Sequence, residues 1–140
     1  VTLAGPLTLL VVPSGVERRT ADQVARVRSR HDRFPSLARP LLEVLGRAVD
    51  EGIAALRARD HASLGEIMQV SHGVLGAFGV SSPVLDAMCS TALRHGALGA
   101  KLTGAGGGGC ILVLPGPDPK PLVEAFVAQG HAPLLVELSP

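Results

Sequence analysis

The sequence predicts an α+β domain of the ferredoxin-like, split βαβ class, with an antiparallel sheet and additional helices in the first crossover. Three observations predict it. Short apolar runs near both ends of the chain and on either side of a central glycine loop are typical of strands. The long stretch between the first and second of these runs has helical periodicity, and one further helical stripe precedes the last run. The expected order is therefore β-αααα-β-β-α-β.

The first strand is predicted at 7–12 and ends at Pro13-Ser14-Gly15. Thr20, followed by Gln23 three residues later, forms a capping-box pattern, which predicts a helix with Thr20 as its N-cap. This helix should end at Phe34-Pro35, because the residue before a proline avoids helical geometry. Its buried stripe is expected to comprise Val24, Val27, His31 and Phe34.

Three more helices are predicted before the glycine loop. The first begins at Ser36 as N-cap, and its apolar face comprises Leu41, Val44, Leu45 and Ala48, weakened by Gly46 and Gly52. The second carries the stripe Leu64, Ile67, Met68, Ser71, Leu75 and Phe78. In the third, we expect Ser82 as N-cap, Pro83 as the first helical residue and Gly96 as the residue that closes the helix.

The last third of the chain is predicted to supply three strands and one helix. Strands are expected at 98–103 and 110–114, on either side of the glycine loop, and again at 134–138. A turn-rich connector covers 115–121. The helix that follows should end at Gln129-Gly130, and its stripe comprises Leu122, Val123, Phe126 and Val127.

Composition favours one cytoplasmic domain spanning residues 1–140, with a core of leucine, valine and alanine. No apolar run approaches the roughly 18–20 residues of a membrane helix. Cys89 and Cys110 are too few for a disulfide framework, which favours a reducing compartment. With a net charge of +1, three Phe and neither Tyr nor Trp, the chain lacks the features of a nucleic-acid binder. Its histidines and cysteines show no metal-ligand spacing.

The glycine-rich stretch 104–109 is the strongest local signal. Five of its six residues are glycine, and each costs about 0.4–1 kcal/mol relative to alanine, because glycine loses more backbone freedom on folding. The stretch is either a tight turn or a concave backbone surface against a phosphate or another backbone. We favour the second interpretation, because a hairpin turn needs only one or two glycines. The spacing fits neither a Walker loop nor a Rossmann fingerprint.

Other candidate residues have both a structural and a functional interpretation. The early segment carries Arg18, Arg19, Arg26, Arg28, Arg30 and Arg33. One interpretation is a solvated helix face with an Asp22–Arg26 ion pair. The alternative is a position near an anionic ligand, mainly for Arg18. Thr103 and Lys101 are either ordinary strand residues or face a ligand. His72 is expected as a histidine whose hydrogen bonds are satisfied within the fold, with a substrate contact as the alternative.

The stretch Lys101-Leu102-Thr103-Gly104-Ala105-Gly106-Gly107-Gly108-Gly109-Cys110 resembles the third glycine-rich motif of the GHMP small-molecule kinases, most closely in their mevalonate kinase branch. The resemblance extends over roughly Leu7 to Leu114. Leu75-Gly76-Ala77-Phe78-Gly79-Val80-Ser81, Leu85-Asp86 and Gly96-Ala97-Leu98-Gly99-Ala100 are similar to the lead-in to that motif. Val16-Glu17-Arg18-Arg19-Thr20 is similar to a Val-Pro-Arg-Ser-Thr segment, from which Glu17 and Arg19 depart. Gln69-Val70-Ser71-His72 departs from a Met-Asn-x-Asn-His pattern.

The resemblance implies a two-domain kinase that uses ATP and Mg²⁺. The family's Gly-Leu-Gly-Ser-Ser-type loop and its catalytic Asp and Lys are not found in these 140 residues. The chain is therefore expected to be the C-terminal domain, inactive alone, with no catalytic residue and no metal ligand of its own. Its expected partners are the N-terminal domain of the same kinase, which would bind most of the ATP and Mg²⁺, and a small-molecule substrate. The full enzyme is expected to be a homodimer, without nucleic-acid or membrane partners.

The same resemblance implies roles for individual residues. Thr103 and the loop residues would lie beside the nucleotide phosphates and steady the phosphate loop of the missing domain; the loop residues are Gly104, Ala105, Gly106, Gly107, Gly108 and Gly109. Thr20 and Arg18 would face the substrate. The substitution Gly107→Val is expected to abolish activity while leaving this domain folded, because a side chain there would meet the missing domain.

The implied reaction is phosphoryl transfer from ATP to mevalonate, giving ADP and 5-phosphomevalonate for isoprenoid biosynthesis. Two alternatives stay open: another kinase of the family, acting on phosphomevalonate, homoserine or a sugar, and a non-catalytic ferredoxin-like module that uses the loop to bind a ligand.

Overall fold

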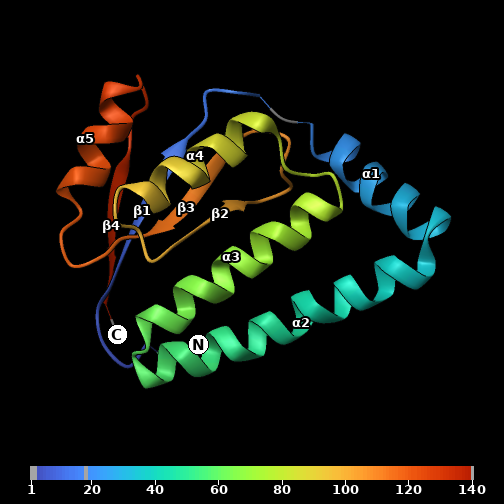
Figure 1. Cartoon of the computed structure of the whole chain (residues 1–140), viewed down its shortest axis with the longest axis horizontal. Helices are drawn as coiled ribbons and strands as arrows, with labels where there is room; N and C mark the ends of the chain where they lie inside the picture. The colour runs from blue at the N-terminus through green and yellow to red at the C-terminus, as the bar shows by residue number, and fades with distance from the viewer. Residues whose placement is uncertain (1–2, 18, 140) are drawn as a thin grey trace.

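The computed structural model describes residues 3–17 and 19–139, and its elements follow the predicted order (Figure 1). They are β1 (Leu7–Pro13), α1 (Thr20–Arg33), α2 (Pro35–Ala58), α3 (His61–Ala77), α4 (Pro83–Arg94), β2 (Gly99–Thr103), β3 (Cys110–Leu114), α5 (Lys120–Ala128) and β4 (Leu134–Leu138). Among the described residues, no helix is both long and apolar enough to cross a membrane.

The strands form one sheet in the order β2-β3-β1-β4, and every neighbouring pair is antiparallel. The register places Val12 opposite Ile111, Leu102 opposite Ile111 on the other side of β3, and Leu9 opposite Val136. Since β3 is antiparallel to both β1 and β2, those two strands are parallel to each other and separated by β3. This is the split βαβ arrangement, so the predicted fold class is confirmed.

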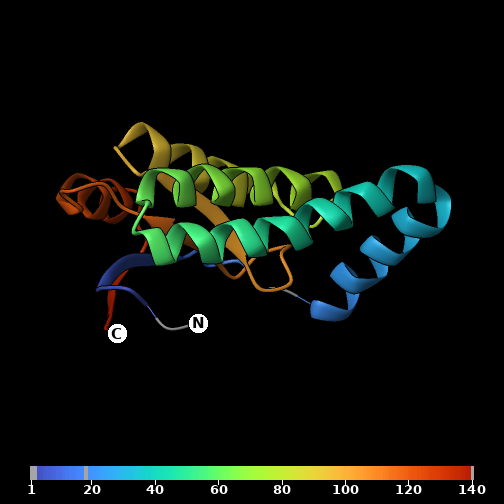
Figure 2. The same ribbon diagram turned by 90° about the horizontal axis from the view of Figure 1, so that it is seen from below.

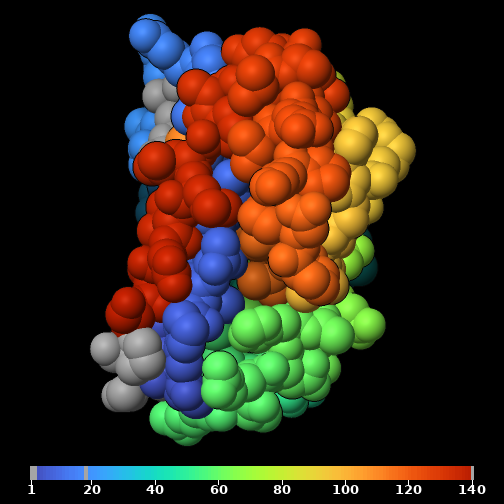
Figure 3. Space-filling model, turned by 90° about the vertical axis from the view of Figure 1, so that its left-hand side faces the viewer, coloured from blue at the N-terminus to red at the C-terminus, as the bar shows by residue number. Residues whose placement is uncertain are grey.

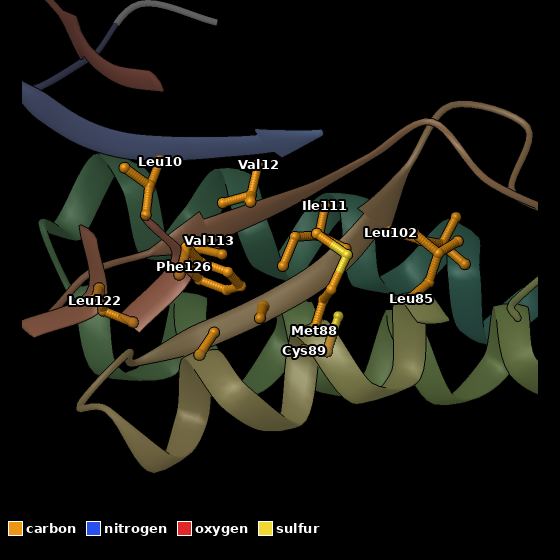
Figure 4. Close-up of a cluster of buried hydrophobic side chains, with 12 residues drawn as sticks. Leu10, Val12, Leu85, Met88, Cys89, Leu102, Ile111, Val113, Leu122 and Phe126 are labelled. Atoms are coloured by element: carbon orange, nitrogen blue, oxygen red, sulfur yellow. The ribbon is translucent and has the colours of Figure 1, made fainter. Parts of the chain in front are cut away.

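The main core lies between one face of the sheet and the helices α4 and α5 (Figure 4). Its strand residues alternate along the chain, as expected when one face of each strand is covered. The fully or almost fully buried members are Leu10, Val12, Leu85, Met88, Cys89, Ala92, Ala100, Leu102, Ile111, Val113, Leu122 and Phe126. Burying each large aliphatic side chain contributes about 1.5–3 kcal/mol to the core.

A second cluster joins the opposite strand positions to α2 and α3. Leu7 and Leu114 are buried there with Met68, and the partly buried residues packed on them are Leu3, Leu9, Leu56, Leu64, Leu98 and Leu112. The helices α2 and α3 lie side by side in both ribbon views (Figures 1 and 2). The outer strand β4 lies at the molecular surface beside β1 and α5 (Figure 3).

The ends of most elements agree with the sequence predictions, but the start of the early helices differs. Ser82 caps α4 by accepting a hydrogen bond from the Leu85 amide, as predicted. The capping box at Thr20 is wrong: the N-cap of α1 is Arg19, which makes no side-chain capping bond, and Thr20 is the first helical residue. Ser36 is likewise not a cap, because α2 begins at Pro35, whose fixed φ suits the first helical position.

The predicted buried stripe of α1 is also only partly correct. Val27 packs against the cluster around Phe78, but Val24 is 56% exposed and Phe34 is 48% exposed. The buried residue of this helix is the polar Gln23, at 8% exposure. The apolar residues of α1 are exposed because this helix leads away from the sheet beside the glycine loop. One of its faces therefore borders a hollow rather than a packed core.

Candidate functional site

The glycine loop, residues 104–109, joins β2 to β3 and projects from the sheet near the start of α1 (Figure 2). Four of its glycines have positive φ angles: +77° at Gly104, +85° at Gly106, +75° at Gly107 and +80° at Gly109. Residues with a Cβ rarely adopt this left-handed conformation. The loop backbone therefore requires glycine at these four positions, whatever the loop binds.

Two other segments of the chain hold the loop from both sides. On one side the Gly107 amide donates to the Val80 carbonyl at 2.7 Å, in the connection between α3 and α4. On the other side Gly109 donates its amide to the Val16 carbonyl at 3.0 Å and accepts a hydrogen bond from the Ser14 amide at 2.7 Å. The loop is thus clamped between the α3–α4 connection and the β1–α1 connection.

Close packing explains why side chains are absent at three positions. A Cβ on Gly108 would lie 2.5 Å from the Val16 carbonyl oxygen, and a Cβ on Gly106 would overlap the Val80 carbonyl oxygen. A Cβ on Gly107 would overlap the side-chain amide of Gln23. The first neighbour of a Gly107 side chain therefore lies inside this domain, whereas the resemblance placed it in the missing domain. That the Gly107→Val variant stays folded and loses activity remains a prediction.

Gln23 is the site residue that sequence reasoning missed. Its side chain is buried under the loop, and among the described residues its Oε1 atom has no hydrogen-bond partner. An unsatisfied buried acceptor costs about 1–3 kcal/mol, so such groups are rare in folded proteins. In the sequence, Gln23 looked like half of a capping box, and no local pattern indicated that it would be buried.

A hollow of about 520 Å³ lies next to the loop. It is walled by α1, α2, the end of α3 and the first loop residues; the lining residues are Gln23, Val24, Val27, Arg28, His31, Asp32, Leu42, Leu75, Val80, Gly104 and Ala105. Most of this lining is aliphatic, and the charged groups are those of Arg28 and Asp32. The hollow can therefore receive a small molecule with an apolar part and an anionic part.

The structure brings the two segments that carry the predicted site residues together. The β1–α1 connection, which leads to Thr20, contacts the loop through Val16 and Glu17. Thr20 itself is exposed at the start of α1, and Thr103 is half-buried at the end of β2, opposite Cys110. Arg18 lies outside the described residues.

The arginines of α1 have different roles. Arg30 donates to the Ala77 carbonyl, and Arg26 donates to the Gly79 carbonyl at 3.5 Å, so both interact with the C-terminal end of α3. This is where a helix carries partial negative charge. The expected Asp22–Arg26 pair is not among the ion pairs between described residues. Arg28 lines the hollow beside the loop and is the arginine of α1 best placed to meet an anion there.

Lys101 and His72 are both turned towards the fold. The Lys101 ammonium donates to the Leu102 carbonyl at 2.9 Å, and burial lowers the pKa of this lysine. His72 contacts the β2 backbone and Asp86, which confirms the prediction of a histidine satisfied within the fold. Within residues 3–17 and 19–139, no group of three or more His, Cys, Asp or Glu side chains is arranged to hold a metal ion.

Comparison with known proteins gives a consistent family match. Residues 53–132 match the family described as "GHMP kinases C terminal". The chain is 36% identical over 138 residues to a mevalonate kinase of Pyrococcus abyssi, covering 95% of this chain and 41% of that protein. It is 39% identical over 127 residues to the mevalonate kinase of Bos taurus, covering 85% of this chain and 32% of that protein.

Among solved structures, L. major mevalonate kinase in complex with R-mevalonate matches with a TM-score of 0.93 at 26% identity. The match covers 99% of this chain and 44% of that one. The chain therefore spans about two fifths of the length of the first relatives it matches, 41% in the Pyrococcus abyssi protein.

Proposed function

Because this chain belongs to the GHMP kinase family, through that family's C-terminal domain, we propose that it is the C-terminal domain of a two-domain, ATP-dependent small-molecule kinase. The observation that carries the proposal is the glycine loop. Its backbone is forced into a conformation that only glycine adopts readily, and its flanks hold it rigidly in place. A rigid surface without side chains is suited to close approach by a second backbone or a phosphate group.

We propose mevalonate as the acceptor, with 5-phosphomevalonate and ADP as products and isoprenoid biosynthesis as the pathway. The proposal is supported by the mevalonate kinases among the relatives, at 36% and 39% identity. In the whole enzyme, Thr20 and Arg18 would contact the acceptor. The adjoining hollow, whose charged groups are Arg28 and Asp32, offers mostly apolar walls and one guanidinium to a small branched carboxylate.

The loop fits a supporting position beside the nucleotide better than a phosphate cradle of its own. The amides of Gly107 and Gly109 already donate to carbonyls of this domain, and the inner side of the loop is filled by Val80, Gln23 and Val16. We propose that Thr103 and Gly104 to Gly109 steady the phosphate loop of the N-terminal domain. Bound ATP would supply the phosphoryl group, with Mg²⁺ neutralising its charge; most ligands of both would come from that domain.

The N-terminal domain of the same kinase is the proposed main partner of this chain, whose own domain we propose to span residues 1–140. We further propose a homodimeric enzyme that works in the cytoplasm, in line with the free thiols of Cys89 and Cys110.

The test uses the complete reading frame that contains this sequence. The purified full-length protein is assayed for ADP release with mevalonate, phosphomevalonate, homoserine and galactose as separate acceptors. We expect turnover with mevalonate that exceeds turnover with the other three at least about 100-fold, since mismatched polar groups in a site discriminate strongly. Turnover mainly with another acceptor would correct the substrate, and no turnover with any would overturn the kinase proposal.

The 140-residue chain alone provides the control for the domain assignment. We expect no turnover by this chain and recovery of activity when the separately produced N-terminal part is added. Ligand binding by the chain alone, without recovery on addition of that part, would favour a non-catalytic binding module instead.

A further inference from the structure

His72 connects three segments around the glycine loop. It lies on α3, and its side chain is 16% exposed. Its Nδ1 atom is 3.2 Å from the backbone nitrogen of Leu102, in β2, and its Nε2 atom is 3.0 Å from a carboxylate oxygen of Asp86, in α4. The Cys89 thiol of α4 also lies 3.9 Å from Nδ1, where its S–H can donate to the same nitrogen. Both ring nitrogens are therefore engaged, and the ring joins α3 to β2 and to α4.

The chemistry of these partners determines where the imidazole proton lies. The backbone amide of Leu102 can only donate, so Nδ1 must accept and carry no proton. In the neutral ring the proton is then on Nε2, which donates to Asp86. A protonated ring or the Nδ1–H tautomer would place two hydrogens against each other and break the bond to Leu102.

The bond to Leu102 matters because β2 is an edge strand. One side of β2 pairs with β3, whereas on the other side no strand formed by the described residues receives its backbone groups. At Leu102 two side chains take the place of a neighbouring strand: His72 accepts from the amide, and Lys101 donates to the carbonyl. Gln69, one turn earlier on α3, donates to the Leu98 carbonyl at 3.1 Å. The helix α3 thus closes the open edge of the sheet.

The bond to Asp86 reaches the other wall of the loop. The same carboxylate oxygen accepts a hydrogen bond from the Ser81 hydroxyl at 2.6 Å. Ser81 directly follows Val80, whose carbonyl accepts from the Gly107 amide. Leu102, on the other side, is separated from the loop by Thr103 alone. One imidazole is therefore linked both to the strand that enters the loop and to the connection that supports it.

We propose that His72 is a positioning residue for the glycine loop: its neutral, Nε2-protonated ring holds β2 and the α3–α4 connection in a fixed relation, and so aligns the loop. The proposal rests on the proposed function in one respect, that the loop lies beside the reacting phosphates. A loop displaced by even 1 Å would misplace groups in the reaction and reduce the rate without removing any group that touches substrate.

Two substitutions in the full-length kinase separate the two bonds. In His72→Asn, the side-chain oxygen takes the place of Nδ1 and still accepts from Leu102, whereas the bond to Asp86 is lost. In His72→Gln, the side-chain amide reaches the position of Nε2 and still donates to Asp86, whereas the acceptor for Leu102 is lost. We expect His72→Gln to lower kcat about 10- to 100-fold with little change in the KM for the acceptor. We expect His72→Asn to lower kcat in the same way but less, because Asp86 is still held by the Ser81 hydroxyl when its bond to the imidazole is lost.

A matched control is available on α4. His95 is exposed, and its Nδ1 atom lies 2.9 Å from the Thr91 carbonyl oxygen within its own helix. His95→Gln should leave kcat unchanged. If either His72 variant kept the kcat of the wild type, or if it changed only the KM for the acceptor, the positioning role would be overturned.

A second measurement is independent of both activity and the stability of variants. The imidazole ¹⁵N chemical shifts of the wild-type full-length protein distinguish the two neutral tautomers at pH 7.5. We expect His72 to carry its proton on Nε2, and we expect slow hydrogen exchange at the Leu102 amide. An Nδ1–H tautomer would overturn the proposal even in an active enzyme. If the full-length protein showed no kinase activity, the proposed kinase function would be overturned. The tautomer of His72 and the exchange rate of the Leu102 amide would still show whether His72 holds β2.

Discussion

Gly106 and Gly107 both have backbone φ angles in the left-handed region, +85° and +75°, but their α-carbons face different neighbours. The α-carbon of Gly106 lies against the backbone carbonyl of Val80, which cannot move without shifting the α3–α4 connection. The α-carbon of Gly107 lies against the end of the Gln23 side chain, which can rotate. The two glycines therefore share a backbone requirement and differ in the packing requirement.

This difference predicts the relative cost of two alanine substitutions. Gly106→Ala and Gly107→Ala should each lose about 1–2 kcal/mol for placing a Cβ in the left-handed region. Gly106→Ala should lose a further 1–3 kcal/mol or so, because the loop must separate from a fixed backbone. Denaturant unfolding of both variants measures the two losses under the same conditions.

The control is the same pair of substitutions in a Gln23→Ala background. Removing the Gln23 amide should leave the cost of Gly106→Ala unchanged and lower the cost of Gly107→Ala only slightly, because the amide already rotates away in the wild-type background. Equal costs for the two glycines in both backgrounds would show that their neighbours do not decide the effect.

At the scale of elements, α3 and β2 approach each other closely enough to exclude side chains. Gly65 of α3 and Gly99 of β2 are both buried and lie against each other's backbone, so that a Cβ on either would overlap the partner segment. This contact lets Gln69 and His72 of the same helix reach the backbone of β2. The helix therefore serves as the neighbour that the edge strand lacks.

The close contact between α3 and β2 predicts opposite effects for two glycine-to-alanine substitutions in α3. Gly65→Ala should destabilise the protein by about 1–3 kcal/mol or more, because its Cβ would overlap the Leu98 carbonyl. Gly73→Ala should stabilise it by about 0.5–1 kcal/mol, because nothing lies within 4 Å of a Cβ there and alanine favours the helix. Chemical unfolding measures the free energy of unfolding of both variants. Changes of the same sign would contradict the close contact between α3 and β2.

Most elements could be predicted from local patterns, and α1 shows where these patterns fail. The bounds of β3 and β4, 110–114 and 134–138, and the Ser82-Pro83 start of α4 depend on nearby residues and agree with the structure. In α1 the apolar Val24 is exposed and the polar Gln23 is buried. The neighbour of Gln23 is Gly107, more than 80 residues further along the chain, so no local pattern reports its burial.

At the scale of the whole molecule, the accessibility of the Cys89 thiol shows whether the main core is closed. Cys89 is 4% exposed and lies between α4 and the sheet (Figure 4). Cys110, at the start of β3, is partly exposed. Burial, and to a smaller extent the Asp86 carboxylate, raise the pKa of the Cys89 thiol from an ordinary value of 9.0 to about 12. A disulfide reagent should therefore modify Cys110 in the native protein and Cys89 only when the core opens.

The same pKa predicts how stability depends on alkaline pH. The unfolded chain loses its Cys89 proton near pH 9, whereas the folded protein keeps it until about pH 12. The stabilisation linked to the protonated thiol is therefore complete below pH 9 and is lost as the pH rises towards 12. The lowered pKa of Lys101 acts in the opposite direction, because the folded state releases that proton first.

Comparison with Cys89→Ala separates the thiol from the lysine. The free energy of unfolding is measured for the wild type and the variant between pH 8 and pH 10.5. Above pH 9, we expect the free energy of unfolding of the wild type to fall relative to that of the variant, by up to about 1.4 kcal/mol per pH unit. A difference that stays constant over this range would contradict the assigned role of the buried thiol.

The order of the elements, the ends marked by proline and glycine, and the family follow from the amino-acid sequence alone, because these depend on residues close together in the chain. The glycine motif was recognisable from its composition and flanks alone. The folded arrangement of the chain is needed to explain why each glycine is required, why Gln23 is buried under the loop, and how His72 joins β2 to α4. Those properties arise from contacts between distant segments, whose distances and directions exist only once the chain has folded.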